Sequence, residues 1–358
     1  MKKRSILFLI CSFLLFSKTR AQYLRECGTP SSSHDFLKDI PSHEYNRLPG
    51  QKVIKMFVVI YRDNNGANQA MTEAEVLEEI RVADSVYNIG NICFTVVGVE
   101  LRNSTTYNNP IFPQNYSSEI VSDAFTVFVV NNVYDEPDSL SGIFGWSPGV
   151  VATYMITKKA GFGTRRTFIH EMGHALGLDH TFKGTGHDAN NLGCDELADG
   201  SNGTTCGDFV QDTPADPYQR CGTTISGCSF PYTAPACKDA NNQSYNPQMT
   251  NYMSYWANYD CNRTTFTTNQ YTRMQDAIDN NASLSALLAP NTKTVSNATI
   301  SSGFVKEAAV SSITAGPNYI LNSSVKARIT SSQIILVPGF VAQPNNAGII
   351  IITPSLCQ

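Results

Sequence analysis

Apolar residues in the first part of the chain follow two kinds of pattern. Residues 53–61 (VIKMFVVIY) are apolar and β-branched almost throughout, which is typical of a strand covered on both faces. A Thr-x-x-Glu capping box then precedes apolar residues at helical spacing, so we expect an amphipathic helix over 72–89. Residues 93–101 and 125–130 repeat the strand pattern. This order of elements predicts an α/β layer.

The pattern is shorter and less regular farther along the chain. It predicts short strands over 143–146 and 150–156, followed by a helix over 164–176. After that helix the chain is mostly loop, rich in Gly, Asp, Asn and Cys, until a last helix over 270–278. Residues 289–358 then combine Ser, Thr, Val and Ile with almost no charge, so we expect a small, separate β-rich accessory region there.

The first 21 residues have the pattern of a secretory signal peptide. A basic start precedes an apolar run over 6–16, and Thr19-Arg20-Ala21 forms a small-x-small cleavage site. The apolar run is too short for a permanent transmembrane helix, and no later window holds 18 consecutive apolar residues. We therefore expect a secreted, extracellular protein without a membrane span. The polar stretch over 22–50 is interpreted as a pro-segment.

Composition narrows the class of protein further. With 358 residues, 42% of them hydrophobic and 16% charged, the chain is neither disordered nor a coiled coil, and it is long enough for more than one folded unit. The signal contains five basic residues and no acid, so its removal takes the net charge from −4 to −9. Nucleic acid is therefore a poor partner.

Cysteines are concentrated in the loop-rich region. Of ten cysteines, Cys11 lies in the signal, and six of the other nine fall within residues 194–261. Clustered cysteines in an exported chain indicate disulfide bonds. Nine is an odd number, so at least one mature cysteine has a different role.

Residues 170–180 (HEMGHALGLDH) contain the pattern H-E-x-x-H-x-x-G-x-x-H. His170 and His174 lie one helical turn apart, so both imidazoles can bind one Zn²⁺, and Gly177 allows a sharp turn that brings in His180 as third ligand. Three nitrogen ligands leave a fourth position open, as in a catalytic zinc site. Glu171 is placed to act on a metal-activated water and not to bind the metal.

This motif resembles the signature of the metzincin metalloproteases, in which a methionine in a tight turn follows downstream. Asn251-Tyr252-Met253-Ser254-Tyr255 supplies it: Met253 matches the Met-turn residue, and Tyr255 matches a tyrosine near the zinc. The segments over 178–182 and 207–214 resemble the pappalysin (cytophagalysin) branch. The resemblance covers residues 50 to 280 and implies a metzincin-like zincin domain over 51–288, with a mixed twisted sheet, an active-site helix and an irregular C-terminal subdomain.

The resemblance also implies a calcium site in the acidic loop. No Lys or Arg occurs between Lys183 and Arg220, whereas seven acids do, and such a loop repels itself unless a cation is present. By resemblance, the carboxylate of Asp208 and the backbone oxygen of Thr213 bind calcium. The alternative is a solvated acidic loop held by disulfides. His187, in the same loop, is expected to be exposed.

Residues 24–30 (LRECGTP) resemble a pro-segment motif in which a cysteine thiolate blocks the zinc. Cys27 would then be the fourth zinc ligand until the segment is cut away, between Arg47 and Val53. The alternative places Cys27 in a disulfide and leaves Cys93 or another as a buried thiol. The resemblance further implies a bond from Cys261 to the cysteine-rich loop. Its partner stays open among Cys206, Cys221, Cys228 and Cys237.

Together these features predict a secreted zinc endopeptidase, made as a zymogen, that acts on proteins or peptides. Glu171 would be the general base, Tyr255 would donate to the oxyanion, and 143–146 would be the edge strand that pairs with substrate. A zinc amidase is a second possibility. The tail over 334–357 resembles β segments that end many secreted proteins of Bacteroidetes, which implies surface or matrix attachment. The rival function is therefore an adhesion protein that uses the protease-like domain as a scaffold.

Overall fold

The computed structural model describes residues 27–30, 50–137, 139–163, 166–185, 194–218, 228, 230, 237–256, 261–343 and 349–353. The expected signal peptide, most of the expected pro-segment, His187 and Cys221 lie outside these residues. Among the described helices, none combines the length and apolar character that a bilayer crossing requires.

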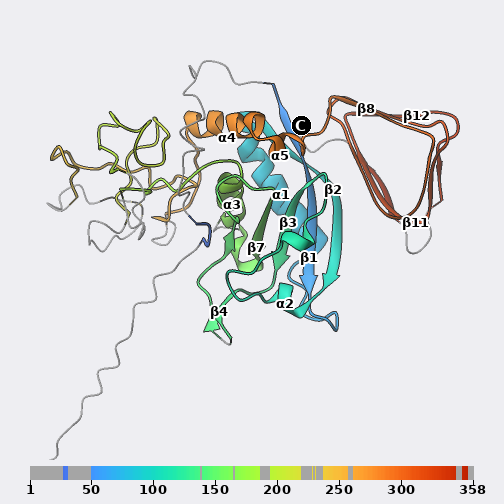
Figure 1. The fold of residues 1–358 in the computed structure, drawn as a ribbon, viewed down its shortest axis with the longest axis horizontal. Helices are drawn as coiled ribbons and strands as arrows, with labels where there is room; N and C mark the ends of the chain where they lie inside the picture. Colours follow the sequence, from blue (N-terminus) through green and yellow to red (C-terminus); the bar gives the residue numbers. More distant parts are fainter. Residues whose placement is uncertain are drawn as a thin grey trace, which may run out of the picture.

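A five-stranded sheet forms the centre of the larger part of the molecule (Figure 1). Its strands, in spatial order, are β2 (Ile92–Asn103), β1 (Lys52–Arg62), β3 (Phe125–Val130), β7 (Tyr154–Lys158) and β6 (Gly145–Trp146). The first four are parallel, and β6 is antiparallel to β7. All six residues of β3 are buried, because both faces of the sheet are covered. The expected α/β layer is confirmed, with β6 as the edge strand.

Helices cover one face of this sheet. They are α1 (Glu73–Tyr87), α3 (Thr167–Ala175) and α4 (Thr268–Asn280). The predicted capping box at the start of α1 is present, and α4 has a second one. Apolar residues of the three helices share one core cluster with the sheet. The Tyr87 hydroxyl also donates to the Ile169 carbonyl at 2.7 Å, which joins α1 to α3.

Shorter elements complete this part of the chain. They are α2 (Thr105–Asn108), α5 (Ala282–Ser285), β4 (Tyr134–Glu136), β5 (Ser139–Leu140) and 3-10 turns at Asn88–Gly90, Ser117–Glu119 and Lys159–Gly161. The strand predicted over 150–156 begins only at Tyr154, because the residues before it cap α3. The amides of Val151 and Ala152 donate to the carbonyls of His174 and Ala175 at 2.9 and 3.0 Å.

The C-terminal region is a small parallel β-solenoid. Its strands are β8 (Thr292–Val295), β9 (Ala298–Ala308), β10 (Ser312–Ala315), β11 (Tyr319–Thr330), β12 (Gln333–Leu336), β13 (Val341–Ala342) and β14 (Ile349–Thr353). Every pairing among them is parallel, and Ser312 pairs with both Thr292 and Gln333, so successive coils lie 20 and 21 residues apart. Figure 1 shows the coils stacked at one end of the molecule.

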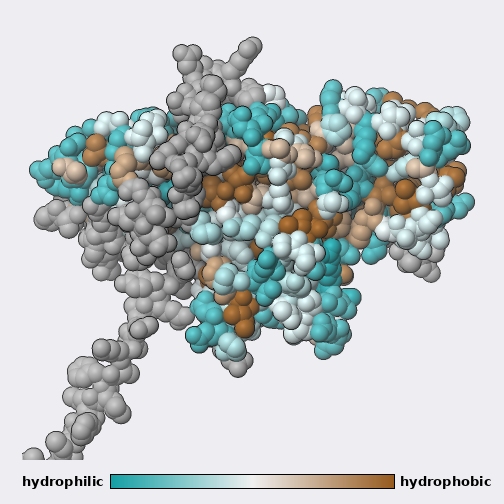
Figure 2. All heavy atoms as spheres, in the orientation of Figure 1, coloured by the Kyte–Doolittle hydropathy of each residue, from teal (hydrophilic) through white to brown (hydrophobic). Residues whose placement is uncertain are grey.

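The solenoid packs against the face of the sheet opposite the helices. Phe304 meets Phe57 edge to face with ring centroids 5.0 Å apart, and Ala308 belongs to the same core cluster as Phe57. Lys306 donates to the Ser122 carbonyl at 2.6 Å, and Arg328 pairs with Glu73. Figure 2 shows apolar surface gathered near this junction. The solenoid thus has a core of its own and adds a few side chains to the apolar cluster on this face of the sheet.

Candidate metal centre

Three histidines and one cysteine converge behind the edge strand. The Nε2 atom of His174 lies 3.1 Å from that of His170 and 3.0 Å from that of His180. With the Sγ atom of Cys27, these ligand atoms all lie within 4.8 Å of one another, and all four residues are buried. Three nitrogens and one sulfur around a common point match the tetrahedral donor set of zinc. The predicted ligands are therefore brought together.

Backbone carbonyls orient two of the imidazoles. The Nδ1 atoms of His170 and His174 lie 2.6 and 2.8 Å from the carbonyls of Tyr252 and Leu178, which turns both Nε2 atoms toward the common point. Burial lowers the pKa of His170 well below its usual range and that of His174 to about 4. Both rings are therefore neutral at neutral pH, as metal binding requires.

Gly177 makes the turn that separates the second and third histidines. Its φ is +101°, and a Cβ atom there would lie 2.8 Å from the Cβ of Ala277. Backbone conformation and space therefore both require glycine at this position. Its amide donates to the His174 carbonyl at 2.9 Å, which ends α3 and releases the chain toward His180.

Met253 lies fully buried under α3, where the Met-turn was expected. A Cβ atom on Gly173 would lie 2.6 Å from its Sδ atom, so the sulfur packs directly against the metal-motif helix. The Thr181 amide donates to the Met253 carbonyl at 3.2 Å. The turn therefore supports both the helix and the loop after His180.

Asp216, to which sequence analysis gave no role at this centre, joins the same two segments. Its Oδ2 accepts hydrogen bonds from the hydroxyls of Thr181 and Ser254, both at 2.7 Å, and its Oδ1 accepts from Trp256 Nε1 at 2.9 Å and from the Tyr218 amide at 3.1 Å. In the sequence, Asp216 is one of the seven acids between Lys183 and Arg220. Nothing in its local pattern distinguished it from them.

Glu171 lies beside the cluster and is completely buried. Its Oε2 atom accepts hydrogen bonds from the Thr29 hydroxyl at 2.7 Å, the Ser147 amide at 3.1 Å and the Cys27 thiol at 3.4 Å. Its Oε1 atom has no hydrogen-bond partner among the described residues. Burial raises the pKa of Glu171 to about 7. The carboxylate is thus placed to exchange a proton near neutral pH.

Residues 27–30, called the arm below, run along the edge strand. Cys27 forms a parallel bridge with Gly145, and the Gly28 amide donates to the Gly145 carbonyl at 2.9 Å. The Tyr255 hydroxyl donates to the Cys27 carbonyl at 3.2 Å, and its ring lies 4.8 Å from that of His180. The centre therefore includes Tyr255, as expected, and also Thr29 and Ser147, which sequence analysis missed.

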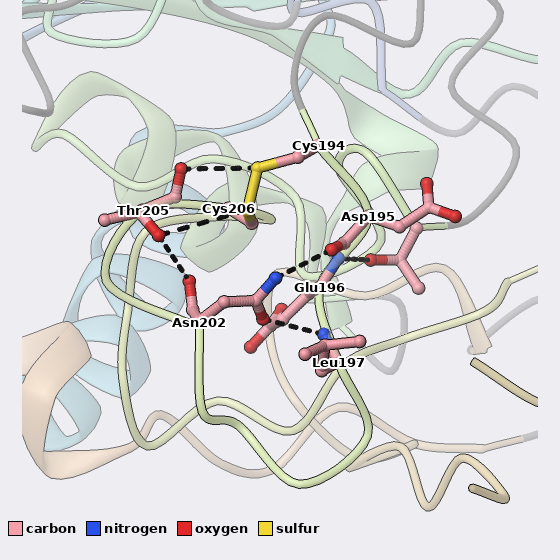
Figure 3. Close-up of a disulfide and its surroundings, with 8 residues drawn as sticks. Cys194, Asp195, Glu196, Leu197, Asn202, Thr205 and Cys206 are labelled. Atoms are coloured by element: carbon pink, nitrogen blue, oxygen red, sulfur yellow. Dashed lines mark hydrogen bonds between the residues drawn. A yellow bond between two sulfur atoms is a disulfide. The ribbon is translucent and has the colours of Figure 1, made fainter. Parts of the chain in front are cut away.

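Cys27 is the free cysteine among the described residues. Cys93 is disulfide-bonded, so the alternative in which Cys27 is paired and Cys93 is a buried thiol is wrong. Cys261 pairs with Cys228, which confirms the expected bond to the cysteine-rich loop and selects one of the four candidates. A second disulfide joins Cys194 to Cys206 (Figure 3).

The loop closed by this second disulfide holds one buried acid, Glu196, and a second, Asp208, follows two residues after the loop. The Asn202 side chain donates a hydrogen bond to the Asp195 carbonyl and accepts one from the Leu197 amide, on either side of Glu196 (Figure 3). Glu196, Asp208 and Thr213 are each at most 1% exposed. Both carboxylate oxygens of Glu196, the Oδ2 of Asp208 and the Oγ1 of Thr213 have no hydrogen-bond partner in the described structure.

Burial and mutual repulsion make these acids hard to ionise. Burial, followed by the charges of Asp208 and Asp216, raises the pKa of Glu196 to about 10. Burial also raises the pKa of Asp208 to about 8. Buried oxygens without partners that face a like charge suit a hard cation. Asp208 and Thr213, which the sequence suggested, thus each have a buried side-chain oxygen without a hydrogen-bond partner among the described residues, and Glu196 has two.

Comparison with known proteins is consistent with this geometry. Residues 147–279 match the model of peptidase family M43, described as pregnancy-associated plasma protein-A. The matched segment includes the three histidines, Glu171 and Met253, and the arm lies outside it. A search of curated proteins finds no match.

Proposed function

We propose that the chain is a secreted zinc endopeptidase made as an inactive precursor, because residues 147–279 match the model of a metallopeptidase family, M43. The observation that carries the proposal is the convergence of three imidazoles with a buried carboxyl group next to them. Retention of Glu171 beside the cluster favours hydrolysis over adhesion.

Zinc, which the family implies, would be held by His170, His174 and His180 and would supply a Lewis acid for the scissile carbonyl. Glu171 takes the proton of the attacking water and returns it to the leaving amine. Tyr255, whose hydroxyl already donates to a peptide carbonyl in the arm, donates to the oxyanion once that carbonyl has left. Strand β6 pairs with an extended substrate through Gly145.

The arm keeps the precursor inactive in three ways. Its Cys27 sulfur takes the fourth ligand position, and its Thr29 hydroxyl donates a hydrogen bond to the Oε2 atom of Glu171. The arm also uses the carbonyl of Gly145 that a substrate would need. Removal of the segment before residue 50 would free all three groups.

The proposal is tested by incubating the zinc-loaded chain, freed of the segment before residue 50, with a library of unstructured peptides. Cleavage at internal bonds that stops on chelation and returns with Zn²⁺ would support it. Release of single terminal residues, or cleavage only of amides that are not peptide bonds, would contradict the endopeptidase function. The second result would favour the zinc amidase.

We further propose that Glu196, Asp208 and the Thr213 backbone bind a structural calcium. Calcium at saturating concentration is expected to raise the melting temperature by about 5 °C or more relative to a calcium-chelated sample. Glu196→Gln should lose this increase. Asp199→Asn, a change of the same charge at an exposed position of the same loop, should keep it. Equal calcium responses in both variants would refute this site.

A further inference from the structure

We propose that Phe112 closes the subsite next to the metal and restricts the enzyme to substrates with a small residue there. The inference rests on the proposed endopeptidase function and deepens it, because it names a feature of the substrate. Its starting point is the contact between Phe112 and Gly28 of the arm. Among the described residues, the arm is the segment that lies along β6, where a substrate would lie. Its contacts therefore show how much space β6 and its neighbours leave for a substrate side chain.

The space above Gly28 is filled by an aromatic ring. A Cβ atom built on Gly28 would lie 2.4, 2.8 and 3.2 Å from three ring carbons of Phe112. The φ of Gly28 is not in the left-handed region, so its backbone conformation is open to any residue. Glycine is therefore required at this position by space alone.

The ring is held by its neighbours. The Phe112 amide donates to the Tyr134 carbonyl at 2.7 Å, which fixes its backbone against β4. Its ring meets Trp146 of β6 edge to face, with centroids 5.3 Å apart. Trp146 in turn packs on Tyr116, which is fully buried. A side chain that displaced the Phe112 ring would break this aromatic packing.

Gly28 marks a position beside the reacting bond. Its neighbour Cys27 places its sulfur among the metal ligands, and the Gly28 amide pairs with Gly145. An extended peptide that pairs with Gly145 in the parallel sense of the arm and presents its scissile carbonyl to the metal places one residue flanking that bond under Phe112. We therefore expect Gly, Ala or Ser at one position flanking the cleaved bond.

Substrate profiling tests this expectation directly. The arm-free wild type should cleave peptides with a small residue at that position, and Phe112→Ala should raise cleavage of peptides with Leu or Phe there about tenfold or more relative to the glycine peptide. Ile111→Ala, an exposed change in the same loop, is the matched control. Unchanged profiles in Phe112→Ala would overturn the proposal.

A second measurement does not depend on proteolysis. In the zinc-loaded precursor, Gly28→Leu should raise the rate of Cys27 alkylation, read by mass spectrometry, about tenfold or more, because the leucine cannot fit under Phe112. Adding Phe112→Ala to Gly28→Leu should bring the rate back toward wild type. Equal rates in both backgrounds would refute the contact. If no peptide is cleaved but the alkylation result holds, the proposed function fails and the contact stands.

Discussion

Replacement of Glu171 by Gln is expected to lower kcat/KM for peptide hydrolysis by about 10³-fold or more while the metal centre stays loaded. Glutamine keeps the shape of the side chain and can still accept the Ser147 hydrogen bond through its oxygen, but it cannot take a proton from water. Glu171 does not belong to the four ligands of the cluster, so zinc content should not fall. The assay uses arm-free protein and a cleaved library peptide, with metal content measured on the same sample.

The matched control is Glu78→Gln, an equal change of charge at an exposed position on α1. It should retain wild-type activity. If Glu171→Gln kept a tenth or more of the activity with full zinc, another group would have to act as the base. If it lost zinc as well as activity, the experiment would assign Glu171 to the metal site and not to proton transfer.

The metal motif could be predicted from sequence because its geometry is local. His170 and His174 are related by one turn of α3, and Gly177 sets the turn to His180 through its own φ. The Met-turn was found through resemblance and not through any local rule. Its contact with Gly173 depends on how residues 80 positions apart meet in the fold.

Other features of the site depend on tertiary packing that no short pattern encodes. The Thr29 hydroxyl contacts Glu171, which lies 142 positions away in the sequence, and the Phe112 ring contacts Gly28, which lies 84 positions away. Asp216 and Glu196 look alike in sequence, yet one accepts four hydrogen bonds and the other has two oxygens without partners. Only the surrounding donors distinguish a structural carboxylate from a cation ligand.

The β-solenoid was predicted only as β-rich, because its period is weakly marked. Inward positions such as Ile313 and Ile334 recur 21 residues apart and are paired in adjacent coils. The residues between them vary in type, and β9 and β11 include a register shift that breaks strict alternation. A comparison of residues 292–315 with 312–336 at this spacing is the signal that could have found it.

Replacement of Cys27 by Ala is expected to activate the uncut precursor, at least tenfold over the uncut wild type. Removing the sulfur opens the fourth ligand position, whereas the Gly28 bond to Gly145 and the Thr29 bond to Glu171 remain. The activity of uncut Cys27→Ala should therefore stay below that of arm-free protein. Adding Thr29→Val should raise the activity of the uncut protein further, because valine has no hydroxyl to donate to Oε2 of Glu171. Activity of uncut Cys27→Ala no higher than that of the uncut wild type would contradict a blocking role for the thiol.

Binding of the metal by the thiolate gives an independent measure of the same contact. In the metal-free precursor, burial and then the negative charge of Glu171 raise the pKa of the Cys27 thiol well above its usual range, so it is protonated at pH 8.5. The thiolate is the form that binds zinc, whereas His170 and His174 are already neutral. Zinc uptake at pH 8.5 should thus release the thiol proton of the wild type. Glu171, with a pKa of about 7, is ionised at pH 8.5 and does not contribute. A water takes the place of the sulfur in Cys27→Ala and can release a proton too, so the two proteins are compared by Co²⁺ binding, in which the wild type should show a thiolate charge-transfer absorption that Cys27→Ala lacks. Equal absorption in that band from both cobalt-loaded proteins would mean that Cys27 does not bind the metal.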